Sequence, residues 1–274
     1  MSGTDPQRNR LAGLGDGERV YAGAAVETAA ESLIELYGAV GLDWVWIDLE
    51  HKNASPLDGP TLERLTRAGE CSGVALVVRL PDGDPATVRK VLDAGVRTVV
   101  VPRVETAADL RRAAEACYFE YDSGAGARGL SQSRSSGYGT AYLGDESYHR
   151  TEDDAVRLGV LVEDERAVQN LPAILDVPEL DFVFPGPGDL SVSMGHPQEY
   201  DHPDVRAQIE YVEATCRDRS IPMLGTYHST FTGRDGTRQA IERGYRLLSV
   251  GNEYDFATEI LRERLSWFTD DERG

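Results

Sequence analysis

The sequence predicts an α/β protein that folds as a single (β/α)8 barrel of the TIM type, and three observations lead to that class. Short apolar runs alternate with amphipathic stretches along the whole chain, as in successive strand–helix units. Eight such runs can be counted, which is the number of strands in a closed parallel barrel. The length of 274 residues also suits a fold of about 250 residues. No segment resembles a linker, so residues 1–274 are expected to form one domain.

The elements follow one another in strict alternation. The predicted strands are Tyr21–Val26, Trp44–Asp48, Ala75–Leu80, Thr98–Pro102, Gly159–Glu163, Asp181–Phe184, Met223–Tyr227 and Leu247–Val250. Apolar residues at helical spacing predict helices over Thr87–Leu92, Ala107–Cys117, Arg166–Leu175, Val205–Cys216, Arg238–Arg243 and residues 253–268. Pro85 and Gly95 mark the start and the end of the first of these helices.

Two segments interrupt this alternation. Residues 1–18 are polar and Gly-rich, so we expect them to be flexible, and they lack the apolar core of a signal peptide. Ser123–Asp154 is a long loop insertion rich in Gly, Ser and Arg, expected on the face opposite the active site. Its Arg128 and Arg134 could reach an anionic substrate or a neighbouring subunit, although a solvated loop explains them equally well.

The charge of the chain limits its partners. Asp and Glu number 47 against 28 Lys and Arg, which gives a net charge of −19. Such a surface repels nucleic acid and anionic membranes, so neither is expected as a partner. Only two lysines occur, Lys52 and Lys90. An acidic, Lys-poor surface is typical of adaptation to molar salt, where charges are screened over about 3 Å. An acidic protein of ordinary salt is the alternative.

The location of the protein is predicted from its cysteines and its hydropathy. Cys71, Cys117 and Cys216 lie far apart without a C-x-x-C pair, which fits a reducing cytoplasm and no disulfide framework or cysteine zinc site. No apolar run approaches the roughly 18 residues of a membrane span. We therefore expect a soluble, cytoplasmic protein.

Charged residues end several of the predicted strands. The second strand runs into Asp48-x-Glu50-His51, and packing alone gives a core strand no reason to end this way. Because ligands bind at the carboxyl ends of strands in parallel α/β proteins, these residues are candidates for chemistry. A solvated strand end with a helix cap is the alternative. Arg79 ends the third strand, where it could grip a carboxylate or form a salt bridge.

Two further carboxylates follow the fifth and sixth strands. Glu163 and Asp189 occur without a neighbouring Cys or His, a combination that suits a hard divalent cation such as Mg²⁺ or Mn²⁺. The Gly186–Asp189 turn would let backbone N–H groups approach a ligand, and a helix starting there would favour an anion. Asp189 could equally serve as a helix N-cap.

Seven motifs in order then resemble one family. They are Asp48-x-Glu50-His51, Arg79 followed by Asp84-Pro85, Leu92-Asp93-Ala94-Gly95, Val101-Pro102-x-Val104, Gly126-x-Arg128-Gly129, Val162-Glu163 and Gly186-Pro187-x-Asp189-Leu190-Ser191. Together they are similar to the HpcH/HpaI family of class II, metal-dependent pyruvate aldolases. The similarity covers roughly Tyr21 to Asp255 and implies an enzyme that cleaves a 4-hydroxy-2-oxo acid or a 2-dehydro-3-deoxy sugar acid into pyruvate and an aldehyde.

The resemblance implies a role for each candidate residue. Glu163 and Asp189 would hold the metal, Mg²⁺ or Mn²⁺ with Co²⁺ as an alternative. Arg79 would lie beside the keto oxygen, and the turn formed by Gly186, Pro187, Gly188 and Asp189 would hold the substrate carboxylate through its N–H groups. These are the expected substrate-binding residues.

The resemblance also implies an acid/base and an assembly. His51 would be the catalytic acid/base, acting through bound water, and would be oriented by Asp93 of an adjacent subunit; Asp48 is a second candidate for that role. The last helix would pack on a neighbour in a homohexamer, a trimer of dimers. A helix that closes its own barrel is the alternative.

Two departures and three alternatives accompany the resemblance. Leu161 replaces a Gln common near the metal, and Gly188 replaces an Ala; the first puts the substrate range in doubt. A CoA-thioester lyase of the citrate lyase type, a lysine Schiff-base aldolase and a non-catalytic metabolite-binding barrel are the alternatives. The charge pattern adds a halophilic archaeal source to these expectations.

Overall fold

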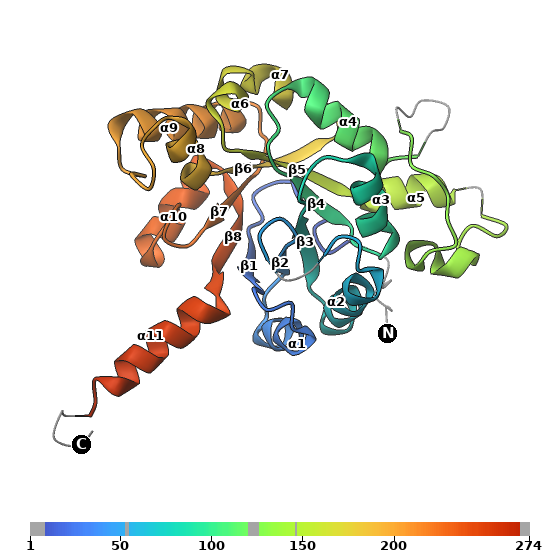
Figure 1. Cartoon of the computed structure of the whole chain (residues 1–274), viewed down its shortest axis with the longest axis horizontal. Helices are drawn as coiled ribbons and strands as arrows, with labels where there is room; N and C mark the ends of the chain where they lie inside the picture. The colour runs from blue at the N-terminus through green and yellow to red at the C-terminus, as the bar shows by residue number, and fades with distance from the viewer. Residues whose placement is uncertain (1–8, 53–54, 120–125, 146, 269–274) are drawn as a thin grey trace.

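The computed structural model describes residues 9–52, 55–119, 126–145 and 147–268, which form a closed barrel of eight parallel strands in chain order (Figure 1). The strands are β1 (Tyr21–Ala25), β2 (Trp44–Asp48), β3 (Ala75–Arg79), β4 (Thr98–Val101), β5 (Arg157–Val162), β6 (Leu180–Pro185), β7 (Met223–Thr226) and β8 (Tyr245–Asn252). All eight predicted strands are confirmed. Because every strand is parallel, all carboxyl ends meet at one mouth of the barrel.

Helices surround the barrel. They are α1 (Glu31–Val40), α2 (Gly59–Ser72), α3 (Pro85–Asp93), α4 (Ala107–Cys117), α5 (Tyr148–Ala155), α6 (Glu165–Gln169), α7 (Leu171–Leu175), α8 (Pro187–Ser193), α9 (Pro203–Asp218), α10 (Gly233–Arg243) and α11 (Glu253–Leu265), with a 3-10 helix, η1 (Arg134–Gly139). The helix predicted over Arg166–Leu175 is wrong as a continuous element. It divides into α6 and α7 at Asn170, because Pro172 lacks the N–H that a continuous helix would use.

The core has two layers. Inside the barrel, Trp44, Val77, Phe182 and Leu224 pack together, and each is fully buried. A larger apolar layer fills the space between the strands and the helices. This arrangement leaves the charged strand ends outside both layers, at the mouth.

The N-terminal segment closes the other end of the barrel. Residues 1–18 were expected to be flexible; residues 1–8 lie outside the described residues and residues 15–18 are exposed, but Asn9, Leu11 and Leu14 are buried. Leu11 is fully buried and joins the inner core layer. The Asn9 side-chain amide donates to the Thr98 hydroxyl at 2.9 Å and to the Ala155 carbonyl at 3.0 Å. The segment therefore plugs the barrel beneath the amino ends of the strands.

The insertion predicted as a loop over Ser123–Asp154 contains η1 and most of α5 within its described part. Arg128 is buried against the Phe119 ring at 4.8 Å and lies 3.7 Å from Glu152. Arg134 pairs with Glu70. Both arginines are therefore held within their own protomer, at the end of the barrel away from the mouth.

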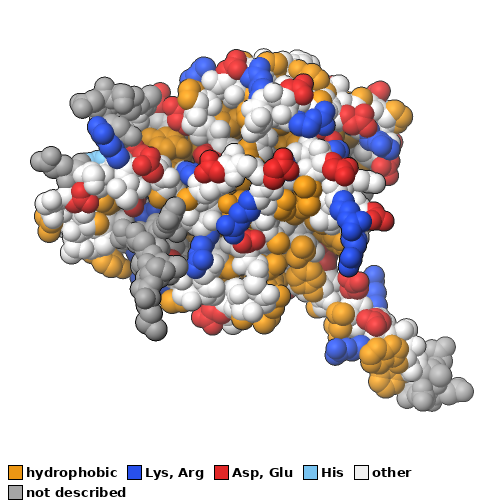
Figure 2. Space-filling model, turned by 180° about the vertical axis from the view of Figure 1, so that it is seen from behind, with side chains coloured by type: hydrophobic (Ala, Val, Ile, Leu, Met, Phe, Trp, Pro, Cys, Tyr) orange, Lys and Arg blue, Asp and Glu red, His pale blue; other side chains and the backbone are white. Residues whose placement is uncertain are grey.

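Helix α11 projects away from the barrel (Figure 1) and buries none of its residues. Apolar side chains gather toward the end of this arm (Figure 2). Leu261, Trp267 and Phe268 are each more than half exposed. In this single chain α11 does not close its own barrel. Among the described residues, no helix is long and apolar enough to cross a membrane.

Candidate active site at the barrel mouth

The end of β2 builds one side of the mouth. The Asp48 carboxylate is buried and accepts the backbone N–H groups of Glu50 at 2.9 Å and His51 at 3.2 Å. These bonds turn the chain back on itself directly after the strand. The turn leaves the imidazole of His51 53% exposed at the mouth. Asp48 thus contacts His51 through the backbone, while the nearest carboxylate to the ring is Glu50, at 3.6 Å from Nε2.

Arg79 is clamped by two carboxylates. In the β2–β3 register Asp48 lies opposite Arg79. The guanidinium donates from Nε to Asp48 at 3.0 Å, forms a second bond with the same carboxylate through Nη2, and lies 3.3 Å from Glu50. Burial tends to raise the pKa of Asp48, but the bonds and charge of Arg79 outweigh it, and the pKa lies below its ordinary value. Arg79 therefore forms a salt bridge, as the alternative interpretation of this residue expected, and the salt bridge fixes the guanidinium at the mouth.

Two residues of this network were not assigned a role from the sequence. Glu50 is almost fully buried and also accepts Arg103 Nη2 at 2.9 Å. The Arg103 backbone, at a φ of 55°, donates its N–H to Glu163 at 2.8 Å. Arg103 follows the end of β4 in Val101-Pro102-Arg103. Its position as a charged residue near a strand end could have indicated Arg103 as a candidate site residue, as the same signal did for Arg79.

Glu163 and Asp189 lie within electrostatic range of each other. Glycine at position 186 lets the turn between β6 and α8 pass beside Glu163, because a Cβ there would stand only 3.0 Å from the Glu163 Cβ. Burial raises the pKa of Glu163 to about 7, and the negative charges of Asp189 and Glu50 add to the rise against the opposing Arg103 N–H. Leu161, the departure from the family pattern, is buried in the inner core and contacts Gly186.

The turn after β6 forms the start of α8. Gly186 is the N-cap residue and Pro187 opens the helix, where its missing N–H costs nothing. The N–H groups of Gly188 and Asp189 lie in the first turn, where no helical carbonyl is available to them. A Cβ at Gly188 would meet no atom within 4 Å, so open space adjoins these donors.

A cavity of about 340 Å³ opens beside Arg79. Aromatic and aliphatic side chains form one part of its wall, namely Trp46, Phe184 and Leu224. The hydroxyl-bearing Thr226 and Ser249 form another part. The cavity therefore offers both apolar surface and hydrogen-bonding groups next to the cationic end of β3.

The two lysines are poor Schiff-base candidates. Lys52 lines this cavity, but its Nζ lies 2.8 Å from the Glu27 carboxylate. The bond to Glu27 raises the pKa of Lys52, whereas a nucleophilic amine needs a lowered pKa. Lys90 is exposed on α3.

Asp93 does not join the mouth of its own protomer. It ends α3, which leads into the amino end of β4, and its carboxylate accepts the Ser133 hydroxyl at 3.3 Å. The structure thus brings Asp48, Arg79 and His51 to one mouth with Glu163 and Asp189, and leaves Asp93 at the opposite end. Any contact between Asp93 and a His51 imidazole requires a second chain.

The residues at the mouth fit a divalent cation. Glu163 is buried beside two further carboxylates, and its raised pKa records the repulsion and desolvation that a cation would relieve. Oxygen donors alone suit Mg²⁺ or Mn²⁺ better than a soft metal. Glu163 and Asp189 are the two that would coordinate it.

Comparisons with known proteins agree with this geometry. A family model described as HpcH/HpaI aldolase/citrate lyase matches residues 23–257. The chain is 32% identical over 232 residues to the 2-dehydro-3,6-dideoxy-6-sulfogluconate aldolase of Pseudomonas putida, covering 84% of this chain and 86% of that one. It is 33% identical over 238 residues to the hydroxypyruvate/pyruvate aldolase of Roseobacter denitrificans, covering 86% and 88%.

A solved structure extends the comparison to three dimensions. The HpcH/HpaI aldolase/citrate lyase family protein from Burkholderia cenocepacia superimposes with a TM-score of 0.84 at 30% identity. The match covers 94% of this chain and 98% of that one. Barrel and sequence thus agree over nearly the whole length, and the chain belongs to the HpcH/HpaI aldolase/citrate lyase family.

Proposed function

We propose that this protein is a class II pyruvate aldolase, a carbon–carbon lyase that reversibly cleaves a 4-hydroxy-2-oxo acid or a 2-dehydro-3-deoxy sugar acid to pyruvate and an aldehyde. One observation carries the proposal. The buried Glu163, with a pKa raised to about 7, shares the mouth with Asp189 and with the clamped guanidinium of Arg79. The aldolase names of the relatives from P. putida and R. denitrificans support the same chemistry.

Glu163 and Asp189 would hold the metal, Mg²⁺ or Mn²⁺ with Co²⁺ as an alternative. When bound, the cation supplies a Lewis acid that stabilises negative charge developing on the 2-oxo acid. The remaining chemistry falls to side chains and backbone groups of the protein itself.

Arg79 would donate hydrogen bonds to the keto oxygen of the substrate. Asp48 and Glu50 already hold the guanidinium in a fixed orientation. The guanidinium therefore needs little reorganisation when negative charge develops on the substrate. The N–H groups of Gly188 and Asp189 would bind the substrate carboxylate, in the turn shaped by Gly186 and Pro187. The aldehyde half would then extend into the cavity lined by Thr226 and Ser249.

His51 would act as the acid/base. It accepts, through water, the proton of the 4-hydroxyl as the C3–C4 bond breaks, and the electron pair stays on C3 as the enolate of pyruvate. Protonation of C3 then completes pyruvate. The exposed imidazole suits this role because it can be reached by a group from another chain, and we assign its orientation to Asp93 of a neighbouring subunit.

The proposed assembly is a homohexamer, a trimer of dimers. Its support is the projecting α11, whose Ile260, Leu261 and Leu265 are exposed in the single chain, whereas Phe256 packs against the core. The second support is the position of Asp93 at the end of the barrel away from its own His51.

A substrate panel tests the activity. Pyruvate released from 4-hydroxy-2-oxo diacids and 2-dehydro-3-deoxy sugar acids is measured with lactate dehydrogenase after quenching, with and without Mg²⁺ or Mn²⁺, in molar KCl. Glu163→Gln and Asp189→Asn should abolish metal-dependent release, while Glu165→Gln, at an exposed carboxylate two residues away, should not. Full activity of Glu163→Gln after exhaustive chelation would refute the assignment. Cleavage of 3-hydroxyacyl-CoA substrates alone would favour the thioester lyase.

A further inference from the structure

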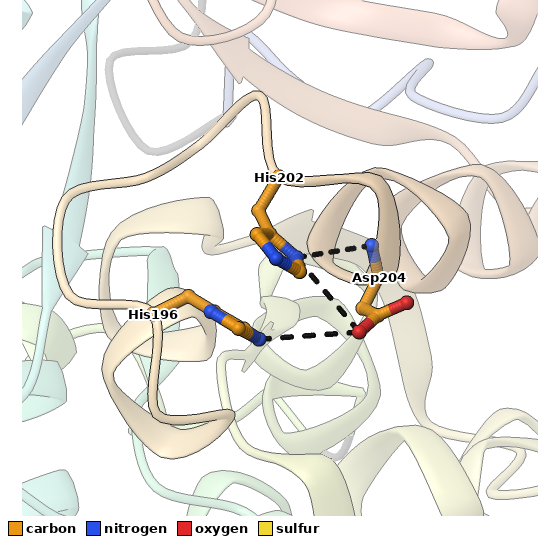
Figure 3. Close-up of side chains that lie close together, drawn as sticks. All are labelled: His196, His202 and Asp204. Atoms are coloured by element: carbon orange, nitrogen blue, oxygen red, sulfur yellow. Dashed lines mark hydrogen bonds and ion pairs between the residues drawn. The ribbon is translucent and has the colours of Figure 1, made fainter.

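A second group of side chains able to bind a metal, separate from the residues assigned to the mouth, lies in the connection between α8 and α9 and in the first turn of α9 (Figure 3). His196, His202 and Asp204 each offer one donor atom, and these atoms all lie within 4.8 Å of one another. His196 Nε2 and His202 Nδ1 stand 3.9 Å and 3.8 Å from the same oxygen, Asp204 Oδ2. The two imidazole rings stack, with centroids 3.5 Å apart.

Two hydrogen-bond acceptors lie close together in this group. The Asp204 backbone N–H donates to His202 Nδ1 at 3.3 Å, so that nitrogen acts as an acceptor and presents its lone pair. His202 Nδ1 also lies 3.8 Å from the Asp204 carboxylate, which is an acceptor too. A divalent cation between them would exchange the long bond from the Asp204 N–H for a metal–nitrogen bond and would relieve the contact between the two acceptors.

The loop holds these side chains in place. His196 donates its backbone N–H to Ser191 at 2.7 Å, and His202 donates its own to Glu199 at 3.0 Å. His202 also occupies the N-cap position of α9, where Ser, Thr, Asp or Asn is usual. The imidazoles are both about 30% exposed and Asp204 is 71% exposed, so one side of the group faces solvent.

We propose that His196, His202 and Asp204 form a second divalent metal site, which takes Zn²⁺ or a similar borderline cation. Zinc binds imidazole nitrogen at about 2.0–2.1 Å, so neighbouring ligands of a tetrahedral ion lie about 3.4 Å apart. The spacings to Asp204 Oδ2 exceed that by less than an ångström, and water can occupy the open fourth position. The two nitrogens distinguish this site from the oxygen-only pair at the mouth. Bound zinc fastens the end of α8, the helix that carries Asp189, to the start of α9.

Zinc stoichiometry tests the proposal independently of aldolase activity. The full chain is dialysed with Zn²⁺ in excess Mg²⁺, and bound zinc is measured by mass spectrometry in the Glu163→Gln background, which weakens the pair at the mouth. One Zn²⁺ per chain is expected. His196→Ala or Asp204→Asn should lower the affinity at least about 10-fold, since losing even an outer-shell partner costs that much. His149→Ala, at a histidine on α5, should leave binding unchanged.

A second readout guards against misfolding. With EDTA present, His196→Ala and Asp204→Asn should have the same thermal midpoint as the parent chain. Only the parent should gain thermal stability when Zn²⁺ is added. If the parent chain binds no Zn²⁺, or if both substituted chains bind as much Zn²⁺ as the parent, the proposed site is refuted.

Discussion

At the scale of single residues, the buried carboxylates of the mouth differ in how many cationic and N–H groups contact them. Asp48 has the bidentate guanidinium of Arg79, and Glu50 has both Arg79 and Arg103. Among the described residues, Glu163 accepts a hydrogen bond only from the backbone N–H of Arg103, and its pKa is raised to about 7. The carboxylate with the least compensation is the one that gains most from a cation. This ranking separates the proposed metal ligand from two carboxylates that hold an arginine.

Replacing the proposed acid/base should have a defined kinetic cost. His51→Ala is expected to lower kcat by about 10²–10⁴, the range for losing a positioned acid/base. Steady-state pyruvate release at saturating metal measures it. His149→Ala, at the other end of the barrel, serves as the control, and an unchanged kcat in His51→Ala would reduce His51 to a strand-end residue.

Asp181 should make stability depend on pH. It lies partly buried at the start of β6, with 23% of its side chain exposed, and this burial raises its pKa from 3.8 to about 6 against the Leu158 N–H at 2.7 Å and the charge of Arg157. The native state therefore holds this proton to higher pH than the unfolded chain. The contribution to stability is complete below pH about 4 and is lost as pH rises to about 6.

Asp181→Asn removes that titration. Relative to the wild type, its free energy of unfolding should rise by about 2–3 kcal/mol between pH 4 and pH 7. Denaturant unfolding at constant KCl measures the difference, with Asp218→Asn on the exposed end of α9 as the control. A difference that does not change with pH would show that Asp181 titrates normally.

At the scale of elements, the barrel is closed at its amino end by a segment that is not part of the strand–helix repeat. Leu11 enters the inner core layer from below, and Asn9 bonds to the start of β4. At the other end, the turn into α8 depends on Gly186, because a Cβ at this position would stand only 3.0 Å from the Glu163 Cβ. Both ends of the barrel are therefore set by short connecting segments.

Loss of the plug should destabilise the whole barrel. Leu11→Ala removes a fully buried side chain and is expected to lower the free energy of unfolding by about 2–5 kcal/mol. Leu57→Ala, at a leucine that is largely exposed, should change it by less than about 0.5 kcal/mol. Equal effects of the two substitutions in denaturant unfolding would contradict a packed plug.

At the scale of the whole molecule, one feature favours association of the chain with further copies and another opposes it. Helix α11 exposes apolar side chains along an arm that leaves the barrel (Figure 2). The net charge of −19 opposes the association that would cover them. Assembly and salt should therefore be linked.

Mixing experiments test the shared site. If Asp93 serves a neighbouring His51, then His51→Ala and Asp93→Asn are each defective, and hybrids refolded from an equal mixture regain about a quarter of wild-type activity, because one site in four has both native residues. Light scattering in molar KCl reports the assembly. Verified hybrids without recovery, or a mass of only 30.0 kDa, would contradict the shared site.

Salt should control assembly before it controls folding. The Debye length falls from about 30 Å at 0.01 M to about 3 Å at 1 M, so protomers of like charge repel least in molar salt. We expect the oligomer mass and thermal midpoint to rise from low to molar KCl at fixed saturating Mg²⁺. A midpoint that is flat or falls with salt would remove the halophilic interpretation and leave the aldolase proposal intact.

The sequence by itself determined the barrel and most of its mouth. Apolar runs of strand length are local patterns, and strict strand–helix alternation makes the strands parallel, which forces their carboxyl ends together. That is why the sequence alone assigns one mouth to Asp48, Arg79, His51, Glu163 and Asp189.

Only the tertiary structure decided the partners of these residues. The Arg79–Asp48 clamp depends on the β2–β3 register, and the bond from Arg103 to Glu163 joins residues 60 positions apart. The plug formed by Leu11 depends on an interior that exists only after the barrel closes. Such contacts join residues that are far apart in the sequence, and local periodicity carries no information about them.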